Sequence, residues 1–394
     1  MAGPLHGVRV VDFTAMLSGP MAGAILADQG AEVIKVESPR GDEVRRMGRP
    51  RNGLTAGFFA CNRGKRSLCL DLKHPEGLEA ARTLIASADV VMQNFRPGAM
   101  DRLGLGAAKL LKAHPRLVYL SISGFGETGP YAHQRVYDPV IQALTGATDI
   151  QADRETGRPK MFRVVVADKV TALTAAQAVT AALFARETTG RGQHIRLAML
   201  DALISFFWPE GMGGLVFVGD EVDVTKFQGT MDLIYETANG FITAGAVTDA
   251  EWRGMCNALD KREWIDDPRF KTTRMRMRNV EERKRLTAAE IRNWDRKEIL
   301  ARLNAEDVPS APLLTRLELL DHEQVVANDI VGIYEFEGHG RIRLARPPAR
   351  FEATPAGIDA PAPQLGEHSE AILTDIGYTD AAIRKLVEQG VVLK

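Results

Sequence analysis

The sequence predicts an α/β protein that has a Rossmann-like large domain with a mostly parallel sheet, and a smaller α/β domain. Three observations support this prediction. The chain has 394 residues, more than one ordinary domain of about 150 residues holds. Short strands that are apolar throughout alternate with helices in its first third, as in parallel sheets covered on both faces. A charged, helical block follows at 250–305, after a Gly-rich stretch near 210–223 that is typical of a linker.

Five strands are expected in the first third, and helices connect them. The strands are 7–13, 31–37, 67–72, 89–95 and 116–126. The first helix is rich in small residues and ends at Gly30, and the second begins near Pro75, since proline is tolerated in a first turn. Ligands of such sheets bind beyond the carboxyl ends of the strands. The loops to consider are therefore 14–20, 38–66, 93–98 and 123–138.

The rest of the chain adds helices and two hairpins. A long helix is expected from Asp168 to Gly190, followed by a short strand and another helix within 189–207. The pair Asn239 and Gly240 is typical of a hairpin turn. A second hairpin is expected within 330–351, and the chain ends in a helical tail.

Composition narrows the function classes. The net charge is −1, so no overall field attracts nucleic acid or an anionic membrane. No run of eighteen apolar residues appears, and the first residues lack the pattern of a secretion signal. Three cysteines without CxxC spacing indicate reduced thiols in a cytoplasmic protein. The motifs of dinucleotide, P-loop and metal sites are absent from the sequence, so neither a metal nor a permanently bound cofactor is expected.

A basic segment lies at the expected ligand end of the sheet. Residues 40–66 carry eight basic side chains against two acidic ones, and Asn94, Phe95 and Arg96 follow a strand. Guanidinium, amide and aromatic groups together suit a small phosphorylated ligand. The same features also fit a solvated charge cluster and a packed strand end. A second basic run, 271–285, is interpreted as a solvated helix face.

Asp168 is the most informative single acid. It lies between a β-branched run, 164–166, expected to be a buried strand, and a long stretch of helix formers. Such a carboxylate can cap the helix by accepting its free N–H groups. It can equally serve chemistry, because a helix N-terminus favours the ionised form that attacks a carbonyl carbon. The local sequence leaves both readings open.

Several separated motifs occur together in one order along nearly the whole chain. They are GVRVVDFTAMLSGPMAGAILADQGAEVIKVE (7–37), CNRGKRSLCLDL (61–72), QNFRPGAMDRLGLG (93–106), TGRGQHIRLAMLDA (189–202), DKREWIDDPRF (260–270), VPSAPL (308–313) and LGEHSEAILTDIGY (365–378). In these motifs the chain resembles the class III CoA-transferase family, which contains formyl-CoA transferase, the carnitine CoA-transferases and α-methylacyl-CoA racemase.

The resemblance implies roles for individual residues. Asp168 matches the catalytic aspartate, which in the transferases attacks the donor thioester and carries first the acyl group and then CoA. Leu17, Arg135 and Tyr137 match positions near the thioester and acyl group. The positions that match contacts to the nucleotide end of CoA are Lys65, Arg66, Asn94, Phe95, Arg96 and Arg102. An acyl-CoA and a small carboxylic acid are then the substrates.

Tyr137 favours transfer over racemisation. The racemase branch of the family has a histidine followed by an aspartate at this position, and this pair works with the catalytic aspartate as acid and base. Tyrosine has an ordinary pKa near ~10 and is a poor base at neutral pH. An acyl-CoA racemase and a non-catalytic acyl-CoA-binding protein remain the alternatives. Leu17 and Ser38 depart from the formyl-CoA transferase pattern, and the long Gly-rich loop of that enzyme is missing, which favours larger dicarboxylic or branched acids over oxalate.

The family's architecture implies three segments and a partner. Residues 1–215 and 326–394 would form the large CoA-binding domain, and residues 225–325 the small domain. Family members form homodimers in which two ring-shaped chains interlock. The resemblance therefore implies an interlocked homodimer, with neither nucleic acid nor membrane as a partner.

Overall fold

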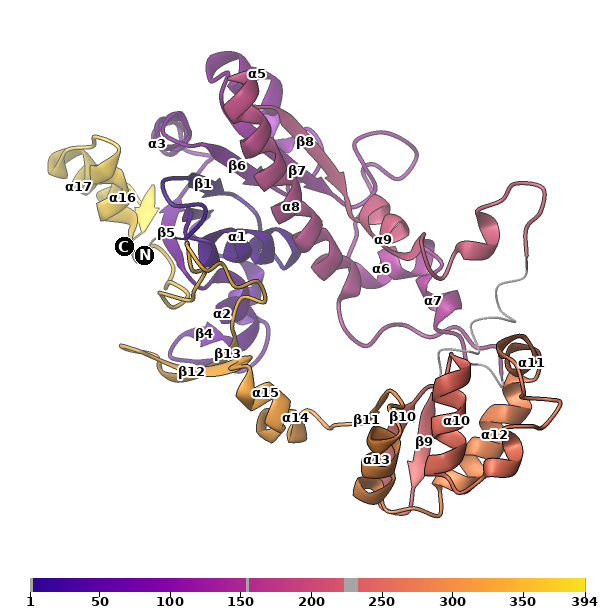
Figure 1. The fold of residues 1–394 in the computed structure, drawn as a ribbon. Coiled ribbons are helices and arrows are strands. Elements are labelled where there is room, and N and C mark those ends of the chain that lie inside the picture. Colours follow the sequence, from indigo (N-terminus) through magenta and orange to yellow (C-terminus); the bar gives the residue numbers. More distant parts are fainter. Residues whose placement is uncertain (1–2, 154–155, 223–232, 394) are drawn as a thin grey trace. The chain divides into compact units, whose positions relative to one another are not determined.

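The chain folds into two compact units (Figure 1). A computed structural model describes residues 3–153, 156–222 and 233–393. The large unit comprises Met1–Pro209 and Asp329–Lys394, and the small unit comprises Glu210–Asn328. Both ends of the chain thus belong to the large unit. The expected start of the small domain, at 225, lies outside the described residues.

The large unit is built on a seven-stranded sheet whose order is β14-β5-β2-β1-β6-β7-β8. Six strands are parallel, and the C-terminal strand pairs antiparallel with β5 at one edge. The mostly parallel α/β prediction is thereby confirmed. The strands are β1 (Arg9–Asp12), β2 (Glu32–Glu37), β5 (Lys65–Leu70), β6 (Val90–Gln93), β7 (Val118–Ser123), β8 (His194–Ala198) and β14 (Val392–Leu393).

Neighbouring residues of each central strand bury opposite faces of the sheet. Val10 and Val90 belong to a core with helices α1 and α8, whereas Val11 and Val91 belong to a second core with α3, α5, α16 and α17. Full burial on both faces explains why these strands are apolar throughout. These helices are α1 (Ser18–Asp28), α3 (Pro75–Ala86), α5 (Ala107–Ala113), α8 (Val166–Thr189), α16 (Ser369–Asp375) and α17 (Asp380–Glu388).

Shorter elements decorate the large unit. The predicted second hairpin is confirmed as β12 and β13, and a smaller pair, β3 and β4, precedes α2. Their bounds are β3 (Pro50–Arg51), β4 (Leu54–Thr55), β12 (Val331–Phe336), β13 (Gly340–Ala345), η1 (Glu43–Arg46), α2 (Ala56–Asn62), α4 (Ala99–Arg102), α6 (Asp138–Leu144), α7 (Ala147–Ile150) and α9 (Met199–Phe207). No helix within the described residues has both the length and the apolarity to cross a membrane.

The small unit packs helices on a three-stranded antiparallel sheet of order β11-β10-β9. The predicted hairpin is formed by β9 and β10, but its turn is Ala238 and Asn239, one residue earlier than expected, and Gly240 begins β10. The unit contains η2 (Gly213–Leu215), β9 (Ile234–Thr237), β10 (Gly240–Ala244), α10 (Asp249–Ala258), η5 (Arg262–Trp264), α11 (Thr273–Arg278), α12 (Val280–Ile291), α13 (Arg296–Ala305), β11 (Ser310–Pro312), α14 (Glu318–Asp321) and α15 (Glu323–Ala327).

Two local predictions are wrong. The run 164–166 is not a buried strand: Val164 is exposed, and α8 already begins at Val166. The basic run 271–285 is not solvated throughout, because Arg276 is only 1% exposed. Its guanidinium pairs with Asp249 at 2.6 Å and lies over the Trp252 ring. A charged side chain can enter a core when it is paired in this way.

Candidate active site

The sheet changes direction between β1 and β6. From β1 the chain first builds outward through β2 and β5, and then returns to add β6, β7 and β8 on the other side. Adjacent strand ends at such a switch point leave a crevice where ligands bind. The two loops that border it are joined, since the Asn94 side chain accepts the Ala15 N–H at 2.9 Å and donates to the Ala15 carbonyl at 2.8 Å.

Asp168 lies in the first turn of α8, where it is the third helical residue and not the cap. The Val165 cap position offers no side-chain hydrogen bond. The half-buried Asp168 carboxyl instead lies beside Ser18, whose hydroxyl and backbone N–H lower the pKa of that carboxyl. Ser18 is the first residue of α1, so the carboxyl lies near two helix N-termini that pack together.

The electrostatic environment of Asp168 differs from the expected one. Its pKa is raised to about 6, first by burial and then by the negative charge of Asp138, while the hydrogen bonds from Ser18 offset part of this rise. The expectation that a helix N-terminus would hold the carboxyl ionised is thus opposed by desolvation. A carboxylate with a raised pKa is still mostly ionised at pH 7, and it is a more basic nucleophile than an exposed aspartate.

Asp138 is also a structural contact of Asp168. Its Oδ2 accepts the backbone N–H of Asp168 at 3.0 Å, and its Oδ1 accepts a hydrogen bond from Gln142 Nε2 at 2.5 Å. The Asp138 and Gln142 side chains both come from α6, which packs against α8. This acceptor does for α8 what a cap residue would otherwise do.

The Lys65 side chain lies in the protein interior, and all of its N–H donors are used by protein acceptors, so none is left for a ligand. Its ammonium is buried and donates three hydrogen bonds, to Asp12 Oδ2 at 2.8 Å, the Pro20 carbonyl at 2.8 Å and Asn62 Oδ1 at 3.0 Å. Burial would raise the pKa of Asp12, but the charges of Lys65 and Lys35 outweigh it and lower that pKa. The geometry therefore corrects the expectation that Lys65 contacts CoA. Lys65 instead supports the first turn of α1 through its hydrogen bond to the Pro20 carbonyl.

A second buried ion pair shapes the loop before Ser18. Lys35 Nζ donates to Asp42 Oδ2 at 3.0 Å and to the Thr14 carbonyl at 2.9 Å, and Asp42 Oδ1 accepts the Met16 N–H at 3.2 Å. Met16 has a φ of 69°, a left-handed conformation that is unusual for a side chain of this size. These contacts hold the loop that presents Leu17 next to Ser18.

The remaining predicted CoA-binding residues divide into two sets. Phe95, Arg96 and Arg102 are exposed, and neither guanidinium group has a hydrogen-bond or ion-pair partner among the described residues. Arg66 lies near the amino end of β5 and pairs with Glu32 and Asp375. It is therefore at the edge of the sheet opposite the switch-point loops, and the structure does not bring it to the site.

Leu17 and Tyr137 are adjacent in the chain to the two residues that contact Asp168. Leu17 precedes Ser18, and the exposed Tyr137 precedes Asp138 at the start of α6. Arg135 is exposed two residues earlier. Sequence reasoning singled out Leu17, Arg135 and Tyr137 but missed their neighbours. The signal for the missed acid was present, since an acid before proline and four residues before glutamine (YDPVIQ) starts a helix.

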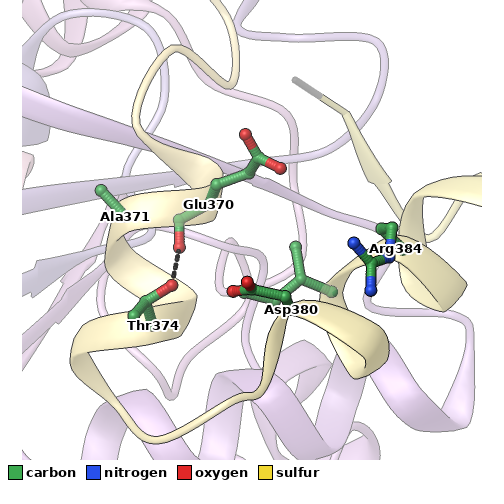
Figure 2. Close-up of a pocket in the computed structure, with 6 residues that line it drawn as sticks. Glu370, Ala371, Thr374, Asp380 and Arg384 are labelled. Carbon is green, nitrogen blue, oxygen red and sulfur yellow. Dashed lines mark hydrogen bonds between the residues drawn. The ribbon is translucent and has the colours of Figure 1, made fainter.

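A surface hollow elsewhere in the large unit is not this site. It has a volume of about 430 Å³ and lies between α16 and α17, as Figure 2 shows. Its lining residues are Glu370, Ala371, Thr374, Asp380, Ile383 and Arg384, and none of them belongs to the predicted set. Across the described parts of the chain, no group of three potential metal-binding acidic, histidine or cysteine side chains is assembled.

Comparison with known proteins gives consistent matches over almost the full length. Residues 5–369 match the model of CoA-transferase family III. Succinate–glutarate CoA-transferase of Agrobacterium fabrum is 34% identical, over 95% of this chain and 96% of the relative. Formyl-CoA:oxalate CoA-transferase of Escherichia coli O6:H1 is 32% identical, over 97% of this chain and 98% of the relative. The crystal structure of a CAIB/BAIF family protein from Brucella suis superposes with a TM-score of 0.83 at 33% identity, and covers 95% of this chain and all of that one.

Proposed function

The chain belongs to CoA-transferase family III, and on that premise we propose that it moves CoA from an acyl-CoA thioester to a carboxylic acid with Asp168 as the nucleophile. The family makes the protein a transferase that acts on CoA thioesters. One observation carries the assignment to Asp168. Its carboxyl is half-buried, lies beside Ser18 at the start of α1, and has a pKa raised to about 6, as befits an activated nucleophile.

The transfer proceeds in two symmetrical halves. The Asp168 carboxylate attacks the thioester carbonyl, the C–S bond breaks, and a mixed anhydride forms as CoA thiolate leaves. The thiolate attacks the aspartyl carbonyl, so the donor acid departs as a carboxylate and Asp168 carries CoA as a thioester. The acceptor carboxylate then displaces the thiolate to form a second anhydride. Attack of the thiolate on the acceptor carbonyl releases the new acyl-CoA and restores Asp168, with no net change in protons.

The nucleotide end of CoA binds at the β6 loop and α4. Arg96 and Arg102 are exposed cations without partners among the described residues, and Phe95 offers an aromatic face beside them. Guanidinium groups bind phosphates through paired N–H donors, and a purine ring can stack on phenylalanine. Asn94 contributes by fixing this loop to Ala15 on the other side of the crevice.

The acid substrates are dicarboxylates. The two relatives described above are named for succinate, glutarate, oxalate and formyl-CoA, and the first three of these carry two carboxyl groups. Arg135 is exposed and has no ion-pair partner among the described residues, so it can bind the distal carboxylate while the proximal one reacts. Leu17 and Tyr137 border the acyl group, and the apolar Leu17 side chain favours an acid with a methylene chain over oxalate.

The active form is an interlocked homodimer in a reducing cytoplasm. Leu173 and Phe184 of α8 and Phe206 of α9 are exposed, and large apolar side chains in contact with water favour burial in an assembly. All three cysteines are buried as free thiols, which suits a reducing compartment. Light scattering of the purified protein tests this proposal: a mass near twice the 43.1 kDa chain supports it, and a monomer contradicts it.

Replacement of Asp168 tests the function. Wild-type protein and Asp168→Ala are assayed for CoA transfer from succinyl-CoA and other acyl-CoAs to a panel of dicarboxylates, and CoA binding is measured by calorimetry. The proposal predicts that Asp168→Ala loses transfer but keeps CoA affinity. Asp149→Ala is the matched control, because Asp149 is an exposed acid in the first turn of α7. Unchanged transfer by Asp168→Ala would refute the assignment.

A further inference from the structure

Two side chains of α6 hold the segment that leads into α8. Asp138 and Gln142 are each only 2% exposed, and Gln142 Nε2 donates to Asp138 Oδ1 at 2.5 Å. Gln142 Oε1 accepts the Phe162 N–H at 2.9 Å, and its Nε2 also lies 3.3 Å from the Val164 carbonyl. Hydrogen bonds from α6 therefore hold the segment that precedes α8 as well as the first turn of α8.

The contact to Asp168 is the last in this series. Asp138 Oδ2 accepts the Asp168 N–H at 3.0 Å, a group that has no intrahelical partner in the first turn. Since Val165 supplies no cap, loss of Asp138 would leave this N–H unsatisfied. A peptide fixed at its N–H also fixes the direction of the side chain that it bears, because the side chain starts from the same residue.

We propose that Asp138 is a positioning residue for Asp168: it clamps the backbone of the nucleophile, and its charge makes the neighbouring carboxylate more reactive. The inference rests on the proposed function of Asp168. Two like charges at close range repel, and acylation removes the charge from Asp168. The repulsion therefore destabilises the free carboxylate but not the acylated aspartate, which favours attack.

Other charged groups near α8 do not explain this effect. The charged residue of α1 is Asp28, at the end of that helix far from Ser18, and it pairs with Arg63. On α9, Asp201 is exposed. On β8, Arg196 pairs with Glu127, and His194 bonds Ser121. Burial is the largest cause of the rise in the Asp168 pKa, and the negative charge of Asp138 is the second.

Three variants separate the clamp from the charge. Asp138→Ala removes both. Asp138→Asn removes the charge, but its amide N–H₂ would face the Gln142 donor. The double variant Asp138→Asn with Gln142→Glu restores a donor–acceptor pair between these two positions and moves the charge one side chain further from Asp168. Asp149→Asn on α7 is the control for an exposed acid.

Two measurements are made on each variant. The ¹³C resonance of the Asp168 carboxyl, assigned by its absence in Asp168→Asn, is titrated with pH. The rate of transfer between succinyl-CoA and glutarate is followed between pH 4.5 and 8. With a pKa of about 6, wild-type Asp168 is about one-tenth ionised at pH 5, and removal of a close charge should lower that pKa by about 1. Asp138→Asn is then about fivefold more ionised at pH 5, and the double variant, which keeps a charge one side chain further away, lies between Asp138→Asn and the wild type.

The inference predicts that the Asp168 pKa is lower in the double variant than in the wild type. The transfer rate of this variant should therefore rise at a lower pH, and its maximal rate at higher pH should be reduced. It predicts a loss of about 100-fold in kcat for Asp138→Ala, as for a nucleophile displaced by about 1 Å. An unchanged Asp168 titration in the double variant would overturn the role of the charge, and wild-type kcat in Asp138→Ala would overturn the clamp. The titration decides the first point even if no transfer is found, which would refute the proposed function instead.

Discussion

Replacing Asp168 with asparagine should make the protein more stable at neutral pH while it abolishes the proposed transfer. Asparagine has the same shape as aspartate and keeps an oxygen that faces the Ser18 hydroxyl and backbone N–H, which lower the pKa of Asp168. It cannot ionise, so the burial and the repulsion by Asp138 that oppose a second negative charge no longer act. Reactive groups in active sites often lower the stability of the folded protein.

The size of the effect follows from the pKa of Asp168. That pKa is about 6 in the folded protein against an ordinary value of 3.8, so ionisation is less favourable in the folded state than in the unfolded chain. The associated loss of stability is about 0.6 kcal/mol at pH 4, about 1.6 kcal/mol at pH 5 and about 3 kcal/mol at pH 7. The stability that comes from neutral Asp168 is thus fully present below pH 3.8 and is lost as pH rises through about 6.

Urea unfolding at a fixed protein concentration measures this difference. The free energy of unfolding of Asp168→Asn minus that of the wild type should rise from about 0.6 kcal/mol at pH 4 to about 3 kcal/mol at pH 7 and then level off. The Asp149→Asn variant, in which an exposed acid is replaced, should show no such rise. A difference that is flat with pH, or a variant less stable than the wild type at pH 7, would refute the account of the Asp168 environment.

Three further outcomes are expected. Lys65→Ala should lower the free energy of unfolding by about 3–5 kcal/mol, measured by urea, because it leaves Asp12 charged and buried without its partner; a selective rise in the KM for CoA with wild-type stability would contradict this. The double variant Arg96→Ala with Arg102→Ala should raise the KM for acyl-CoA at least about tenfold with little change in kcat, which steady-state kinetics can check. In deuterated water without an acceptor acid, an α-branched acyl-CoA should not exchange its α-hydrogen, because Tyr137 is a poor base; exchange seen by NMR would favour racemisation.

Much of the large unit could be predicted from sequence because its central strands are buried on both faces. Val10 and Val11 enter different cores, so every position of the strand must be apolar, and that pattern is readable without a structure. The run 164–166 has the same composition but fails as a strand. Gln142, a residue of α6 about twenty positions earlier, bonds the Val164 carbonyl and the Phe162 N–H just before the run, and composition carries no information about these contacts.

The candidate site could be predicted only in part, for a similar reason. Family resemblance places Asp168 and Tyr137 but not the side chains that support them. Ser18 reaches Asp168 because α1 packs against α8, and Lys65 is withdrawn from the site by the buried Asp12. The sequence alone does not show whether the charge of a basic residue faces a phosphate or a buried carboxylate. The distinction depends on which strand end the residue occupies and on what lies beneath it.

The central claim is that Asp168 carries the acyl group and CoA covalently. Mass spectrometry of the protein incubated with a panel of acyl-CoAs, each with and without hydroxylamine, tests it most directly. We expect the peptide that contains Asp168 to gain the mass of CoA less one water with a true donor, and to become a hydroxamate when hydroxylamine is present. Rapid transfer between acids with no modification of Asp168 under any donor would contradict the claim.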